Sequence, residues 1–135
     1  MDKQEVKRTE RGWAGHFICA EMCQFRRNTL LEYGDKKWVV STIGRMIITN
    51  PQTKKREFDT IGHNRYYETM AFKGAMEEHG YIDANVSEPI DFESEWAIAD
   101  IKADSEQRAN DMHEAVVAEL MIKITEGNSN DENGD

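Results

Sequence analysis

A single amphipathic helical pattern near the C-terminus constrains the fold of this chain more than any other feature. Seven apolar residues there recur at spacings of three and four, which places them on one face of a helix. They are Ala109, Met112, Val116, Val117, Leu120, Met121 and Ile124. Asp104 or Ser105 is a suitable N-cap and Gly127 a suitable end, so the pattern predicts a helix over residues 105–125. This helix has to bury its apolar face on a surface that the rest of the chain supplies.

The chain before this helix has the residues typical of β-strands. Residues 25–33 alternate loosely, and a short Gly-Asp turn leads from them into the β-branched and aromatic run of residues 37–43, which predicts a hairpin. Gly44 is expected to end this run, and a second hairpin is expected to join residues 46–49 to residues 56–58. Further short strands are expected at residues 15–19, 65–72, 80–86 and 90–98. The sequence therefore predicts an α+β fold, a mainly antiparallel β-sheet covered by one C-terminal helix.

The length of 135 residues indicates one domain, large enough to bury a core without a disulfide or a metal. We expect residues 1–12 to be a flexible arm, residues 13–126 to be the α+β domain, and residues 127–135 to be a disordered acidic tail. No apolar run approaches the roughly 20 residues of a membrane span, and the polar N-terminus lacks a signal-peptide core. We therefore expect a cytoplasmic protein, no membrane association, and reduced cysteines.

Charge is unevenly distributed along the chain. Residues 25–56 contain eight lysines and arginines against two acids, whereas residues 77–135 contain seventeen acids against three lysines and arginines. A basic face attracts anions, while an acidic face repels nucleic acid and attracts basic protein surfaces. The formal net charge of −9 argues against general nucleic-acid binding, because phosphate neutralisation dominates that affinity.

The first candidate binding site is the run Arg26, Arg27, Asn28 and Thr29. The arginine forks suit phosphate or carboxylate, and the amide and hydroxyl add hydrogen-bonding groups. On a strand, however, Arg26 and Arg27 point to opposite faces, so one pocket takes at most one of them. The alternative is that both arginines form ion pairs within the protein.

The second candidate is Arg65, Tyr66 and Tyr67. Strand alternation predicts that Arg65, Tyr67 and Thr69 share one face, with Tyr66 on the other. A tyrosine ring can stack on a nucleobase, although aromatic residues in strands more often pack in the core. Among the three tryptophans, Trp13, Trp38 and Trp96, Trp38 lies in the most apolar strand and is expected to be a core residue.

Metal binding and catalysis are weakly indicated. His16, Cys19 and Cys23, with His63 or His79, have the residue types of a zinc site, but buried thiols beside a hydrogen-bonded histidine explain the cysteines more simply. The chain has no Walker loop, GxGxxG, GxSxG or HExxH motif, and a cysteine nucleophile with His16 as its base lacks an orienting residue. His113 lies beside the helical stripe and is expected to be solvent-exposed. We therefore expect a non-catalytic protein without a cofactor.

One stretch resembles a known group of proteins. The segment RGWAGHFIC at residues 11–19, followed by Cys23 and by FRRNTL at residues 25–30, resembles an uncharacterised family of short proteins from phages and mobile elements of gut bacteria. The resemblance implies no activity and no site residue. It implies a context, in which small acidic proteins counter host defence inside the host cell by blocking a nuclease or sequestering a nucleotide signal.

These observations favour a protein that binds a small anionic, nucleotide-like ligand on its basic strands. Arg26 or Arg27 would hold phosphate, Asn28 and Thr29 would add hydrogen bonds, and Tyr66 or Tyr67 would stack. The alternative is an acidic inhibitor that mimics nucleic acid and docks on a basic host protein. A zinc-stabilised interaction module is a third possibility, and homo-oligomerisation stays open.

Overall fold

The structure of this protein is a computed structural model. It describes residues 5–11, 22–61, 65–76, 80, 82–90, 97–102 and 104–134, and for residues 83, 86, 87 and 127–134 it describes the backbone alone. Strands and one helix follow one another along these residues. In chain order they are β1 (Lys7–Glu10), β2 (Cys23–Tyr33), β3 (Lys36–Thr49), β4 (Arg56–Asp59), β5 (Tyr67–Met76), β6 (Ile82–Ile90), β7 (Ala97–Ile98) and α1 (Ser105–Gly134).

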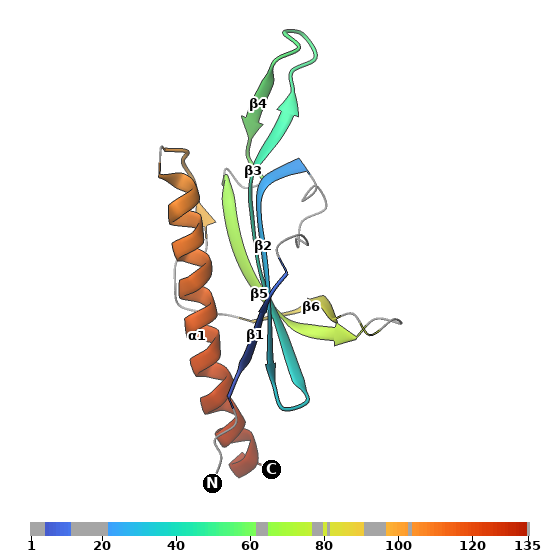
Figure 1. The fold of residues 1–135 in the computed structure, drawn as a ribbon, viewed down its shortest axis with the longest axis vertical. Helices are drawn as coiled ribbons and strands as arrows, with labels where there is room; N and C mark the ends of the chain where they lie inside the picture. Colours follow the sequence, from blue (N-terminus) through green and yellow to red (C-terminus); the bar gives the residue numbers. More distant parts are fainter. Residues whose placement is uncertain are drawn as a thin grey trace.

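The strands form one antiparallel sheet in the order β1-β2-β3-β5-β6, and α1 lies along it (Figure 1). β4 pairs with the end of β3, and β7 pairs with the start of β5. The predicted α+β class is confirmed, as are both predicted hairpins. The first hairpin turns at Gly34, whose φ of 64° lies in the left-handed region that glycine adopts without strain.

The apolar stripe of α1 packs on one face of the sheet, as predicted. At the centre of this interface Leu31, Val40 and Ala71 come from β2, β3 and β5. They pack against Val116, Val117, Leu120 and Ile124 of α1. All seven residues are buried, so this contact supplies the hydrophobic stabilisation that joins the helix to the sheet.

Nearer the start of α1, an aromatic cluster replaces the aliphatic one. Tyr67 is fully buried against Ala109 and Met112, and its ring meets Phe25 edge-on at a centroid distance of 5.8 Å. Gly44 makes room for this ring, because a Cβ there would lie 2.3 Å from Tyr67 Cδ1. Gly44 was expected to end a strand. It instead lies inside β3, where the missing side chain serves packing.

The opposite face of the sheet has its own small cluster, in which Leu30 and Val39 pack against Ile82 of β6. Arg11 links the same two regions, since its Nε donates to Asn28 Oδ1 at 2.7 Å and its Nη1 donates to the carbonyl oxygen of Ile82. This face therefore buries polar as well as apolar groups.

Three of the predicted boundaries are wrong. Residues 7–10, expected within a flexible arm, form β1, because an extended segment can pair with the open edge of β2. Gly127 was expected to end α1, but α1 continues to Gly134. A glycine ends a helix only where its backbone adopts a non-helical conformation, and the backbone of Gly127 is helical. The stretch that contains Pro89 does not separate two strands. β6 passes through it and ends at Ile90, and Pro89 pairs opposite Phe72 with an irregular register nearby.

Other expectations fall on residues that the structure does not describe. The strand predicted at residues 15–19 lies outside the described residues, as do Trp13 and Trp96. Within the described part of the chain, no helix combines the length and the apolar character needed to cross a membrane.

Candidate functional site

The residues of the first predicted site lie on β2, and their side chains alternate between the two faces of the sheet. Arg27 and Thr29 face α1, whereas Asn28 lies on the opposite face, where it accepts the hydrogen bond from Arg11. Arg26 is half-buried and forms no ion pair with any residue that the structure describes. Asn28 and Thr29 are both buried, so a ligand from solvent does not reach them.

Arg27 belongs to a network of ion pairs between β1, β2 and α1. Its Nη2 contacts Glu10, and the same atom lies 2.9 Å from Glu114 Oε2. Arg8 donates from Nη1 to Glu114 Oε1 at 2.8 Å and also bonds Glu10. The alternative interpretation of Arg27, an arginine that pairs within the protein, is therefore the one that the structure supports.

Next to this network, His113 is fully buried between α1 and the sheet. Its Nε2 lies 2.7 Å from Thr29 Oγ1 and its Nδ1 lies 2.6 Å from Thr42 Oγ1. Thr42 Oγ1 in turn lies 2.6 Å from Thr69 Oγ1. The expectation that His113 is exposed is wrong, because His113 follows Ala109 by four residues and so lies within the buried stripe.

These distances determine which imidazole nitrogen carries the proton. Thr29 donates its one hydroxyl hydrogen to Glu10 Oε2 at 2.5 Å, so His113 Nε2 has to donate to Thr29. Nδ1 of the neutral ring then accepts from Thr42, and Thr42 accepts from Thr69. The result is one directed chain of hydrogen bonds that ends on the carboxylate of Glu10.

The same surroundings shift the titration of the three groups. Burial, reinforced by the nearby Arg27 guanidinium, lowers the pKa of His113 from 6.5 to about 4. The hydrogen bond from Arg8 lowers the pKa of Glu114 to about 2. Burial raises the pKa of Glu10, but hydrogen bonds from Thr29 and the arginines outweigh it and bring the pKa below its ordinary value. At neutral pH the network therefore holds a neutral imidazole beside two carboxylates and two guanidiniums.

The residues of the second predicted site are also paired or packed within the protein. Arg65 lies before β5 and its Nη2 is 3.2 Å from Glu68 Oε1. Tyr66 packs against the same apolar cluster as Tyr67, beneath the start of α1. The predicted separation of the two tyrosines on opposite faces is wrong, because β5 begins only at Tyr67 and strand alternation does not extend to Tyr66.

Most of the proposed metal ligands lie outside the residues that the structure describes. His16, Cys19, His63 and His79 lie outside the described residues, and Cys23 is a buried residue that packs with Ile43 and Ile61. Among the residues that are described, no group of three or more histidine, cysteine or acidic side chains could hold a metal ion.

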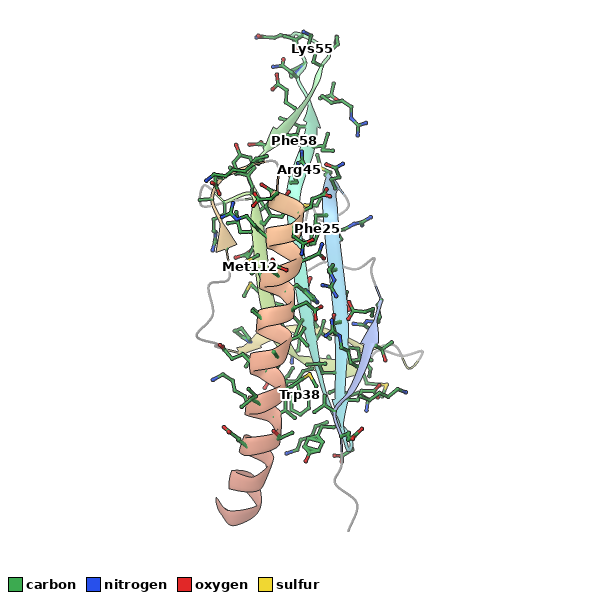
Figure 2. All side chains as sticks on the ribbon, turned by 60° about the vertical axis from the view of Figure 1, so that its left-hand side comes forward. Phe25, Trp38, Arg45, Lys55, Phe58 and Met112 are labelled. Carbon is green, nitrogen blue, oxygen red and sulfur yellow. The ribbon has the colours of Figure 1, made fainter. Side chains whose placement is uncertain are left out.

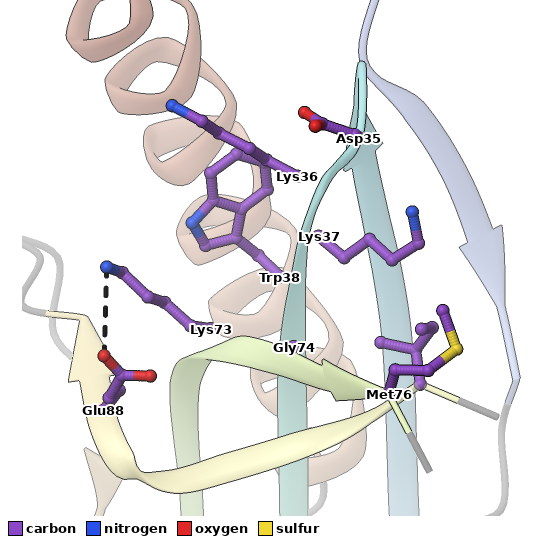
Figure 3. A pocket seen from close by; sticks show the side chains of 9 residues that line it. Asp35, Lys36, Lys37, Trp38, Lys73, Gly74, Met76 and Glu88 are labelled. Carbon is purple, nitrogen blue, oxygen red and sulfur yellow. Dashed lines mark ion pairs between the residues drawn. The ribbon is translucent and has the colours of Figure 1, made fainter. Parts of the chain in front are cut away.

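An open pocket of about 450 Å³ lies at the start of β3, next to the β2–β3 turn (Figure 3). We call it the lysine pocket. It is lined by Asp35, Lys36, Lys37, Trp38, Lys73, Gly74, Met76, Ile82 and Glu88. Lys36, Trp38 and Lys73 lie on one side of β3, and Lys37 lies on the other. Because Trp38 and Lys73 are directly paired across β3 and β5, the indole and the ammonium group belong to the same face.

A β-bulge opens the sheet at this point. Between the partners Phe72–Pro89 and Gly74–Ala84 the register shifts, so that residues 85–88 of β6 lie opposite the single residue Lys73. Gly74 allows β6 to approach closely, since a Cβ there would lie 2.7 Å from Ile82 Cγ2 and 3.1 Å from Lys37 Cβ. Bulges of this kind often occur next to binding sites, where they redirect side chains.

Lys73 and Lys37 are held more loosely than the arginines of the network. Lys73 Nζ lies 4.0 Å from Glu88 Oε1, and Lys37 Nζ lies 3.6 Å from Glu32 Oε2. The side chains of Lys73 and Glu88 are 58% and 51% exposed. Exposed pairs of this geometry contribute roughly 0–1 kcal/mol and exchange readily for another anion.

Sequence reasoning missed both the lysine pocket and the buried histidine. Trp38, predicted to be core, packs against the buried cluster beneath α1, but it is only partly buried and also lines the pocket. Lys73 stood in no motif. No local sequence pattern predicts the bulge between β5 and β6. For His113 a signal did exist: the hydroxyls of Thr29, Thr42 and Thr69 lie on strand positions that share the helix-facing side.

Comparison of the chain with protein-family models, with curated proteins and with solved structures found no match. The site therefore has to be interpreted from its own geometry and chemistry.

Proposed function

We propose that this chain is a non-catalytic binding protein that holds a small anionic, nucleotide-like ligand in the lysine pocket. The observation that carries the proposal is the placement of Lys36 and Lys73 on either side of the Trp38 indole, at an open bulge in the sheet. Two ammonium groups and an aromatic surface are the groups that bind a phosphate and a base together.

The volume of the pocket and the weak ion pair between Lys73 and Glu88 support this assignment. A volume of about 450 Å³ falls within the range of small-molecule sites, which run from roughly 300 to 1,000 Å³. A phosphate can replace Glu88 as the partner of Lys73, because their contact is long and solvent-exposed. The exchange costs little, and the ligand gains a charge-assisted contact.

The residues first considered for this role fit it less well. Thr29 and Tyr67 are fully buried, and Arg27 is occupied by Glu10 and Glu114. Arg26, Arg65 and Tyr66 are partly exposed, but Arg65 is paired with Glu68. Arg26 lies on β2, whereas Tyr66 packs against the aromatic cluster before β5.

The alternative function, an acidic surface that mimics nucleic acid, is less favoured. Glu114 is neutralised by Arg8 and Arg27, and Glu106 lies 3.6 Å from Arg45. Two of the acids on α1 are thus already paired within the protein.

Isothermal titration with mono-, di- and cyclic nucleotides tests the proposal. The panel includes cyclic nucleotides because the resemblance to mobile-element proteins makes a defence signal a relevant ligand. Replacing Lys36 and Lys73 together by alanine should weaken binding by more than about 10-fold, since a charge-assisted contact contributes about 1.5–3 kcal/mol. Trp38→Leu should remove stacking, which contributes about 1–3 kcal/mol per base.

A matched control removes the same charge elsewhere. Lys102 and Lys123 are exposed and lie outside the pocket, so the double alanine variant of these two should bind as the parent does. The proposal fails if no nucleotide binds, or if both double variants lose the same affinity.

A further inference from the structure

The end of the sheet opposite the lysine pocket is a protruding β-ribbon. The paired ends of β3 and β4 extend past the start of α1, with Lys55 near the tip (Figures 1 and 2). All residues from 51 to 59 are exposed. At the base of the ribbon the Arg45 guanidinium lies 4.2 Å from the centroid of the Phe58 ring, which braces β4 against β3.

The tip of the ribbon is ordered by its own hydrogen bonds. Asn50 N donates to the carbonyl oxygen of Lys55, and Lys54 N donates to the carbonyl oxygen of Asn50, both at 2.8 Å. Asn50 Oδ1 accepts from the backbone of Gln52 at 2.9 Å and of Thr53 at 3.2 Å, as in an Asx turn. The tip therefore presents its side chains from a defined turn.

Three consecutive cations at this tip are unneutralised. Lys54, Lys55 and Arg56 form no ion pair with any residue in the described ranges, in contrast to the arginines beneath α1. Glu57 and Asp59 follow on β4, and Glu57 Oε1 accepts from Asn50 Nδ2 at 3.2 Å, so the ribbon keeps a small excess of positive charge, which is greatest at residues 54–56. Charges further apart than about 8 Å are largely screened at physiological salt, so the acidic remainder of the molecule acts weakly on this tip.

We infer that the tip of the β3–β4 ribbon binds double-stranded DNA. A two-stranded ribbon fits the major groove, which is about 12 Å wide, and lysine and arginine neutralise the flanking phosphates. The acidic remainder of the molecule repels DNA, so DNA contacts only the tip. DNA binding at the tip is therefore compatible with a net charge of −9.

Fluorescence anisotropy of a labelled duplex of about 20 base pairs tests the inference across a series of salt concentrations. Three phosphate contacts predict a slope of about −3 in a plot of log K against log salt, with clear binding at about 50 mM salt. The triple variant Lys54→Ala, Lys55→Ala, Arg56→Ala should lose more than about 10-fold in affinity, and Lys55→Ala alone should reduce the slope by about 1.

The control variant, Lys7→Ala with Lys102→Ala and Lys123→Ala, removes the same net charge from exposed positions away from the ribbon. It should retain binding, and circular dichroism verifies that both triple variants are folded. The inference is overturned if the parent does not bind the duplex at about 50 mM salt, or if the two triple variants lose equal affinity. It is also overturned if polyglutamate competes as well as unlabelled duplex, which would indicate an acidic protein partner.

Discussion

Two of the regions in which basic side chains meet carboxylates differ in how firmly the charges are held. Beneath α1, Arg8 and Arg27 share Glu10 and Glu114 through several short contacts beside a buried histidine. At the lysine pocket, Lys73 meets Glu88 through one contact of 4.0 Å in solvent. The first arrangement fixes a helix on a sheet, while the second leaves the cation available to a ligand. A basic residue thus indicates a binding site only where its internal partner is weak.

The largest effect concerns the helix–sheet interface on which the first region depends. Leu120→Asp places a charge in the buried stripe and should destabilise the fold by more than about 3 kcal/mol, enough to unfold much of the protein. Ile122→Asp, two residues away on an exposed position, should change stability by less than about 0.5 kcal/mol. Urea denaturation compares the two. Equal stabilities would show that α1 is not tied to the sheet and would remove the basis of the comparison.

The next effect concerns pH and the buried imidazole. The folded-state pKa of His113, about 4, is lower than its ordinary value of 6.5, so the unfolded chain takes up a proton first as pH falls. Stability is therefore full above about pH 6.5 and declines toward about pH 4. Between about pH 7.5 and about pH 5 the loss from this group should be about 2 kcal/mol, since one pKa unit corresponds to about 1.4 kcal/mol.

The variant His113→Gln isolates this contribution. Glutamine keeps a donor and an acceptor but does not titrate, and the other histidines and the carboxylates are common to both proteins. Urea denaturation at the two pH values should show the steeper loss in the parent. Parallel pH profiles would mean that His113 is not buried in the neutral form.

A smaller effect distinguishes the two neighbouring arginines of β2. Arg27→Ala removes one member of the ion-pair network and should cost about 1 kcal/mol, a modest value because the pairs are partly exposed and Arg8 still holds both glutamates. Arg26→Ala should stay within about 0.5 kcal/mol of the parent. The comparison would need revision if thermal and urea unfolding rank the two variants in the opposite order.

Local patterns predicted much of the fold. The three- and four-residue spacing from Ala109 to Ile124 located α1, because a helix that must bury one face repeats its apolar residues at that interval. The Gly34 turn and the β-branched residues after it located the central hairpin. The strand ends were harder to predict. β1 forms because it pairs with β2, and Gly44 lies inside β3 because its missing side chain makes room for the ring of Tyr67. In both cases the partner is distant in the sequence.

The candidate site could be predicted only in part. Alternation correctly placed Arg26 and Arg27 on opposite faces, but only the packed structure shows that Arg27 has partners on β1 and α1. The lysine pocket depends on a register shift between β5 and β6, and on the pairing of β3 with β5, which places Lys36 and Lys73 around Trp38. Such a juxtaposition arises from tertiary pairing and has no signature at either position alone.

The central claim is that ligand binding uses the lysines around Trp38 and not the arginines that Glu10 and Glu114 hold beneath α1. A titration of the ¹⁵N-labelled protein with the best-binding nucleotide, followed by amide and indole NMR shifts, tests this claim most directly. We predict that the shifts concentrate at the Trp38 indole and at the backbone of Lys36, Lys73 and Gly74. Shifts that instead concentrate at residues 25–29 and 65–67 would contradict the account, as would a nucleotide panel that moves no resonance.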